Sequence, residues 1–222
     1  MIKLVRSVRI QLSNICNMAH KECPISTYTE NVHLPIKYVR SVIDNLETLG
    51  YSGDIGFHIY NEPTIDPRLF YIMKYANEKL PESKVVLWTN GKAVTEGLVE
   101  DFSEIKNLKY YLSCYAGVDA EPLLSEDSEK TSGELDDRLG WYDRPERSTS
   151  RICRAPYSQV TIDYNGNVII CCMDWKSSVV FGNIKNSSLG EILESEYMKK
   201  TAGELSSGNR THELCKRCGT GR

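Results

Sequence analysis

Segments with the period of a strand and segments with the period of a helix alternate over the first half of this chain. Val8, Ile10 and Leu12 alternate with polar residues, which predicts a first strand. The elements expected after it are a helix at 35–49, a strand at 55–60, a helix at 68–80, a strand at 84–88, a helix at 96–105 and a strand at 108–113. Such alternation is typical of a parallel sheet with right-handed crossovers. We therefore expect an α/β fold, a truncated parallel (β/α) TIM-like barrel over residues 1–118.

Polar residues follow the expected strands at the points where such sheets keep their chemistry. Cys16, His20 and Cys23 fall in one short loop directly after the first strand. Sulfur and nitrogen ligands in one loop favour zinc or an iron–sulfur cluster, so we interpret this loop as a metal site. The alternative is a pair of buried free cysteines. The second and third strands end in 61–63 (Asn-Glu-Pro) and 89–91 (Thr-Asn-Gly).

The charge and the cysteine content restrict the class of protein. The 222 residues fit one sizeable domain or one domain with an appendage, and the formal charge of −3, with scattered Lys and Arg, argues against a nucleic-acid partner. The sequence contains neither a run of apolar residues of membrane-spanning length nor a signal-peptide core, so we expect a cytoplasmic protein without a membrane partner. In that reducing compartment, eight cysteines indicate metal or redox chemistry rather than disulfides.

The regular pattern stops near Gly117. Residues 119–152 are acidic and rich in Ser, and we expect a partly ordered connecting segment there. A hairpin is predicted around Asn165 and Gly166, because Asn-Gly between two apolar runs is a strong turn signal. Ser188 followed by Glu191 predicts the start of a helix with a capping box. Residues 153–222 are thus expected to form a small domain of a β-hairpin and a helix.

A second set of cysteines lies in this C-terminal part. It consists of Cys153, Cys171, Cys172, Cys215 and Cys218. Two-residue spacing lets one turn present both Cys215 and Cys218 to a single ion or cluster. One of Cys171 and Cys172 is surplus, because adjacent strand residues point to opposite faces. Spacing alone leaves open whether the site holds zinc or an iron–sulfur cluster.

With these motifs in place, the chain resembles a radical S-adenosylmethionine enzyme with a twitch domain, a SPASM-like domain that holds one auxiliary cluster. The family pattern is three cysteines after the first strand, Gly-Gly-Glu-Pro after the second, Thr-Asn-Gly after the third, and a C-terminal cysteine domain. Here these positions are Cys16, His20 and Cys23, then 60–63, 89–91 and the second cysteine set. The resemblance covers most of the chain.

The resemblance implies two 4Fe-4S clusters and S-adenosyl-L-methionine as cofactors. The first cluster would be held at Cys16, His20 and Cys23, and the auxiliary cluster at Cys153, Cys171, Cys215 and Cys218. Glu62 matches the residue expected to bind the methionine ammonium group, and Asn61, Asn90 and Ser113 are the other expected cofactor-binding residues. The implied activity is the oxidation of a small polar substrate, aminocyclitol or sugar-like, with a reductant such as flavodoxin or ferredoxin.

Arg138 is the candidate catalytic residue. The stretch 137–140 resembles one that lines the substrate pocket of an aminocyclitol-oxidising member of the family, and because arginine keeps its proton its expected role is electrostatic. His58 and Tyr60, at the end of the second expected strand, are either pocket residues or ordinary core residues.

Three positions depart from the family pattern. His20 replaces the middle cysteine, Glu22 replaces an aromatic or hydrophobic residue beside the adenine, and Met173 replaces a glutamate of the aminocyclitol-oxidising relative. An imidazole ligand raises the potential of a cluster. His20 is therefore an unusual ligand, the mark of a disabled site, or a loop histidine that binds nothing. The alternative functions are a radical enzyme that modifies peptides and a catalytically silent iron–sulfur protein of the same fold.

Overall fold

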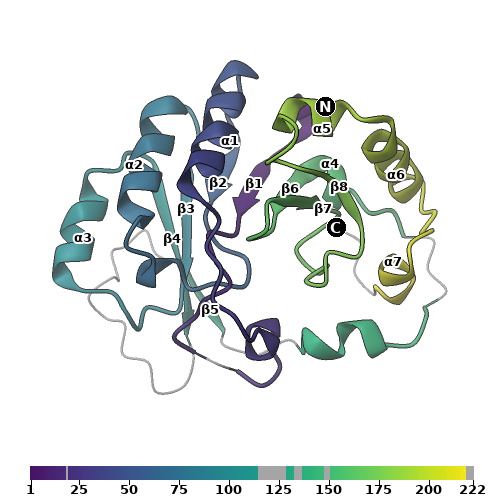
Figure 1. Ribbon diagram of the computed structural model, residues 1–222, viewed down its shortest axis with the longest axis horizontal. Helices are drawn as coiled ribbons and strands as arrows, with labels where there is room; N and C mark the ends of the chain where they lie inside the picture. The colour runs from purple at the N-terminus through teal and green to yellow at the C-terminus, as the bar shows by residue number, and fades with distance from the viewer. Residues whose placement is uncertain (19, 115–128, 133–136, 148–150, 219–222) are drawn as a thin grey trace.

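The computed structural model describes residues 1–18, 20–114, 129–132, 137–147 and 151–218. Its strands form one sheet in the order β5-β4-β3-β2-β1-β6-β7-β8 (Figure 1). Their bounds are β1 Ser7–Ile10, β2 Asp54–Gly56, β3 Val85–Thr89, β4 Leu108–Cys114, β5 Glu129–Ser132, β6 Gln159–Ile162, β7 Asn167–Ile169 and β8 Val180–Asn183. The pairs from β5 through β1 to β6 are parallel, and the last two are antiparallel. With β5 and β8 as its edges, the described sheet is an open barrel, as predicted.

The first three α-helices lie together against the β1–β4 half of the sheet (Figure 1). They are α1 Ile36–Thr48, α2 Leu69–Lys79 and α3 Glu96–Ser103. Helix α1 begins after Pro35 and is followed by Gly50, whose φ of 64° is the left-handed conformation that glycine adopts readily. Fully buried side chains from α1, α2 and the strands fill the space between them, among them Ile43, Ile72, Ile55 and Leu87. This packing fixes the strands and therefore the loops that follow them.

The second strand is shorter than the sequence predicted. Strand β2 ends at Gly56 rather than Tyr60. The reason lies in Asn61, whose side chain donates to the carbonyl of Phe57 and accepts from the amide of Ile59. An asparagine that bonds its own backbone in this way favours a turn over a strand.

Strand β5 was not predicted, because the segment around it is acidic and shows no apolar period. It pairs in parallel with β4, from the Tyr111–Glu129 to the Cys114–Ser132 pair. Within the expected connection at 119–152, positions 119–128, 133–136 and 148–150 lie outside the described residues. The 3₁₀ helix η5 (Leu139–Asp143) also lies in this connection.

The C-terminal part extends the same sheet. The hairpin turn forms at Gly166, with φ of 85°, and β6 pairs with the N-terminal strand β1. The predicted capping box of Ser188 and Glu191 is confirmed. The helices here are α4 Ala155–Ser158, α5 Leu189–Glu194, α6 Glu196–Ser206 and α7 Glu213–Arg217, and the remaining 3₁₀ helices are η1 Ile2–Leu4, η2 Pro24–Thr27 and η3 Pro63–Ile65. No helix in the described ranges is long and apolar enough to cross a bilayer.

Candidate functional site

A cavity of about 400 Å³ lies where the carboxyl ends of the parallel strands meet the C-terminal part of the chain. Its walls come from the cysteine loop, the loop after β2, the ends of β3 and β4, and the stretch before η5. The predicted residues that line it are Cys16, His20, Cys23, Asn61, Glu62, Asn90, Ser113 and Arg138. Arg9, His58, Tyr60, Trp88 and Cys172 complete much of the wall. The structure therefore brings the predicted residues of the first site together in one cavity.

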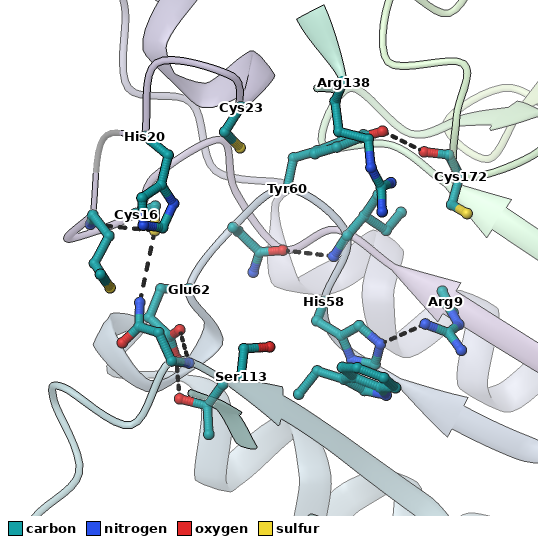
Figure 2. Close-up of a pocket in the computed structure, with 16 residues that line it drawn as sticks. Arg9, Cys16, His20, Cys23, His58, Tyr60, Glu62, Ser113, Arg138 and Cys172 are labelled. Atoms are coloured by element: carbon teal, nitrogen blue, oxygen red, sulfur yellow. Dashed lines mark hydrogen bonds between the residues drawn. The ribbon is translucent and has the colours of Figure 1, made fainter. Parts of the chain in front are cut away.

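The cysteine loop presents its three candidate ligands to this cavity. Figure 2 shows Cys16, His20 and Cys23 on one loop, and all three line the cavity. The amide of Cys23 donates to the carbonyl of His20 at 3.1 Å, which closes the loop. Burial raises the pKa of Cys16 to about 11 and also raises the pKa of Cys23. Buried thiols of this kind become thiolates when a metal centre binds, and thiolate with imidazole is a donor set that suits iron–sulfur clusters.

Glu62 ties together the ends of β2 and β3. Its side chain is buried and receives four hydrogen bonds: Oε1 accepts from the amide and hydroxyl of Thr64 and from the hydroxyl of Thr89, and Oε2 accepts from the amide of Asn90. Oε2 accepts only one of these four hydrogen bonds, so it keeps capacity for a further donor. The predicted contact with the methionine ammonium group of the cofactor would use this position.

We expect Glu62→Ala to lower the free energy of unfolding by about 3 kcal/mol or more, because four buried donors lose their acceptor. Glu62→Gln is the matched variant, since its carbonyl oxygen can still serve the donors on Oε1 while its NH₂ faces the amide of Asn90. The loss should then be smaller. Urea unfolding followed by circular dichroism measures both. Equal stability of the Ala variant and the unmodified chain would show that Glu62 does not hold the strand ends.

The other three predicted cofactor-binding residues differ in what they contact. Asn90 donates from Nδ2 to Asn17 at 2.9 Å and lies 3.9 Å from the sulfur of Cys16, so it supports the cysteine loop. Asn61 uses its amide group within its own turn. Ser113 lines the cavity from β4. Their direct binding of a cofactor stays a prediction.

Arg138 connects the cysteine loop to the C-terminal part. Its backbone amide donates to the carbonyl of Glu22 at 3.0 Å, and its carbonyl accepts from the indole of Trp175 at 2.9 Å. The guanidinium donates from Nη1 to the sulfur of Met173 at 3.1 Å and lies close to the Tyr60 hydroxyl. Figure 2 shows this side chain reaching toward the cavity beside Tyr60. The position fits the electrostatic role predicted for it.

Sequence reasoning did not identify Arg9 as a cavity residue. Its Nη1 lies 2.9 Å from Nε2 of His58, and both line the cavity together with Trp88 (Figure 2). Burial, followed by the neighbouring positive charge of Arg9, lowers the pKa of His58 well below its usual range, so this imidazole is neutral. The alternation of residues along the first strand could have identified Arg9. Val8 and Ile10 are fully buried on the helix side, so Arg9 between them faces the barrel interior.

The four predicted ligands of the second site line one small apolar cavity. They are Cys153, Cys171, Cys215 and Cys218, with Met173 and Trp141 nearby. Burial raises the pKa of Cys215 to about 12 and that of Cys171 well above its usual range. Cys172 lines the larger cavity instead. The structure therefore places Cys171, and not Cys172, with the other three, although both residues follow the end of β7 and the strand alternation assumed for them does not apply.

The donor set of this second cavity is four thiols in apolar surroundings. Four thiolates suit a structural zinc ion and also a 4Fe-4S cluster, since both are commonly held by four cysteines. The residues present therefore fit a cluster, and the choice between cluster and zinc depends on the family to which the C-terminal part is similar.

Comparisons with known proteins favour the cluster. Residues 153–219 match the SPASM family, described as an iron–sulfur cluster-binding domain. The chain is 25% identical, over 98% of its own length and 94% of the relative's, to the S-adenosyl-L-methionine-dependent 2-deoxy-scyllo-inosamine dehydrogenase of Niallia circulans.

Solved structures share the fold. The crystal structure of BtrN in complex with AdoMet and 2-DOIA matches with a TM-score of 0.86 and 23% identity, covering 99% of this chain and 95% of that one. Native anSMEcpe with bound AdoMet matches with a TM-score of 0.61 and 14% identity, covering 96% and 86% of the two chains. Over nearly its whole length, the chain therefore resembles a radical S-adenosylmethionine dehydrogenase that ends in an iron–sulfur cluster-binding domain.

Proposed function

We propose that this protein is a radical S-adenosylmethionine oxidoreductase that oxidises a small polar substrate of the aminocyclitol or sugar type. The observation that carries the proposal is the pair of neighbouring cavities. One is lined by Cys16, His20 and Cys23, and the other by the four cysteines of the C-terminal part. The adjacent residues Cys171 and Cys172 face one cavity each, so the two sites are one residue apart along the chain.

The two cavities have different donor sets, and each has its own role in the reaction. When bound, the first cluster supplies one electron for the reductive cleavage of S-adenosylmethionine, and the second accepts one electron from the substrate during its oxidation. The chain binds the first through Cys16, His20 and Cys23, and the second through four thiolates. Two 4Fe-4S clusters and S-adenosylmethionine are the cofactors that these residues and the comparisons support.

The residues around the larger cavity bind the cofactor and orient the substrate. Glu62 offers one carboxylate position to the methionine ammonium group, and Asn90 holds the cysteine loop in place. Arg138 and Arg9 supply guanidinium groups from two different walls, which suits a substrate rich in hydroxyl oxygens. The substrate in the relative's name, 2-deoxy-scyllo-inosamine, is a small molecule, which favours such a substrate over a peptide.

The electron source and the location follow from the same chemistry. A reducing cluster needs a strongly reducing partner, and we infer a flavodoxin or ferredoxin. Cysteines that form no disulfide among the described residues, and iron–sulfur clusters, are compatible with the reducing cytoplasm, which is where we place the protein.

The experiment is a cleavage assay on anaerobically reconstituted protein with S-adenosylmethionine, dithionite and 2-deoxy-scyllo-inosamine, the substrate in the relative's name. We expect 5′-deoxyadenosine together with a ketone product from the aminocyclitol. Formation of 5′-deoxyadenosine without the ketone would support the radical chemistry and would show that this aminocyclitol is not the substrate. Binding of S-adenosylmethionine without cleavage would favour the catalytically silent alternative, and failure of the reconstituted protein to bind it would overturn the proposal.

A further inference from the structure

Arg210 places a buried positive charge at the wall of the four-cysteine cavity. The residue lies between α6 and α7, and only 8% of its surface is exposed. Its guanidinium donates from Nη1 to the carbonyls of Cys215 and Cys218, at 3.2 and 3.3 Å, and from Nε and Nη2 to the carbonyl of Arg151, at 3.2 Å each. It therefore bridges the segments that carry three of the four cysteines.

These contacts hold the guanidinium in one position beside the thiols. Its positive charge therefore lies at the backbone of two of the four cysteines. Four thiolates with an iron–sulfur cluster are negative, and the cluster becomes more negative by one charge when it is reduced. A fixed positive charge at the wall of this cavity therefore stabilises the reduced state more than the oxidised state.

A negative group also lies near the same cysteines. Asp174 is fully buried and interacts electrostatically with Cys171 and Cys215. Its oxygens accept from the amide and hydroxyl of Ser178, the amide of Val179 and the hydroxyl of Tyr142. Tyr142, Ser178 and Val179 hold this carboxylate, whereas Arg210 donates directly to the backbone carbonyls of two of the cysteines.

We propose that Arg210 raises the reduction potential of the cluster held by Cys153, Cys171, Cys215 and Cys218, and so makes this cluster the electron acceptor of the reaction. The inference rests on the proposed function, because it requires a cluster at this site. In the step concerned, the substrate radical loses one electron to the cluster and one proton to solvent, and the alcohol carbon becomes a ketone. Arg210 lines the second cavity and not the first, so it acts through its charge as a positioning residue.

The test is a redox titration of the reconstituted protein followed by electron paramagnetic resonance. Arg210→Gln removes the charge and keeps a hydrogen-bond donor, while Arg210→Lys keeps the charge. Arg217→Gln is the matched control, because Arg217 is a more exposed arginine of the adjacent helix that pairs with Glu213 at 4.0 Å. We expect Arg210→Gln to shift the equilibrium constant for reduction at least tenfold toward the oxidised cluster, which is about 59 mV for one electron. Arg210→Lys and Arg217→Gln should each shift it less than about threefold.

The outcomes separate this inference from the function it builds on. An unchanged potential in Arg210→Gln, with the cluster intact, would overturn the inference and leave the proposed function standing. Loss of the cluster from both Arg210 variants would also overturn it, because the residue would then be needed to build the site and not to set its potential. Absence of iron from the C-terminal site of the unmodified protein would instead overturn the proposed function.

Discussion

Replacing His20 with cysteine is expected to increase the formation of 5′-deoxyadenosine at least tenfold under a fixed strong reductant. His20 lines the cavity on the same loop as Cys16 and Cys23 (Figure 2), at the position where the family pattern has a thiolate. A neutral ligand leaves the cluster less negative, which stabilises its reduced state and raises its potential. For a one-electron step, lowering the potential of the cluster by about 59 mV makes the equilibrium constant for electron transfer to S-adenosylmethionine tenfold more favourable. Cysteine should lower the potential by on the order of 100 mV or more, as judged from the wide span between cysteine- and histidine-ligated clusters.

The measurement is the rate of 5′-deoxyadenosine release beside an electron paramagnetic resonance titration of the same samples. His20→Ala is the matched variant: it should lose iron from the first site if the imidazole is a ligand, and keep it if His20 binds nothing. S-adenosylmethionine affinity should change little in His20→Cys, because Glu62 and Asn90 are held by contacts that do not involve position 20. No gain in cleavage, with the cluster intact and its potential lowered, would contradict the argument from ligand charge.

The elements of the fold that were predicted correctly are those specified by residues close together in the sequence. The parallel strands and the helices between them carry a clear period, and the Ser188 capping box and Asn-Gly turn are set by residues a few positions apart. Strand β5 has no such signal, since its place is set by pairing with β4. The early end of β2 depends on the hydrogen bonds of one asparagine side chain, Asn61.

The site was predictable where chemistry-bearing residues follow strands, because parallel strands bring those positions together. The sequence predicted that one of Cys171 and Cys172 is surplus, and the two do line different cavities, but both residues follow the end of β7 and neither lies in a strand. Long-range contacts were not predictable. The bond between Arg9 and His58 joins residues 49 positions apart, and the bonds of Arg210 depend on how 151 and 215–218 pack after folding.

Replacing Cys218 with alanine is expected to abolish binding of the auxiliary cluster. The iron content should fall by about half, and the free energy of unfolding should fall by several kcal/mol. The four cysteines come from segments far apart in the sequence, around 153, 171 and 215–218, and they line one cavity. A bound cluster therefore joins these segments, and its binding free energy contributes to folding.

Cys172→Ala is the matched control for this prediction. Cys172 is adjacent to a predicted ligand but lines the larger cavity, and its contact with the Tyr60 hydroxyl uses its backbone carbonyl at 2.6 Å, which alanine retains. We expect unchanged iron content and stability in this variant, measured by iron and sulfide analysis and by urea unfolding under anaerobic conditions. If Cys172→Ala loses the cluster while Cys171→Ala keeps it, the ligand is Cys172 and not Cys171. In that case the auxiliary cluster would lie in the larger cavity, and the division of chemistry between two cavities would be wrong.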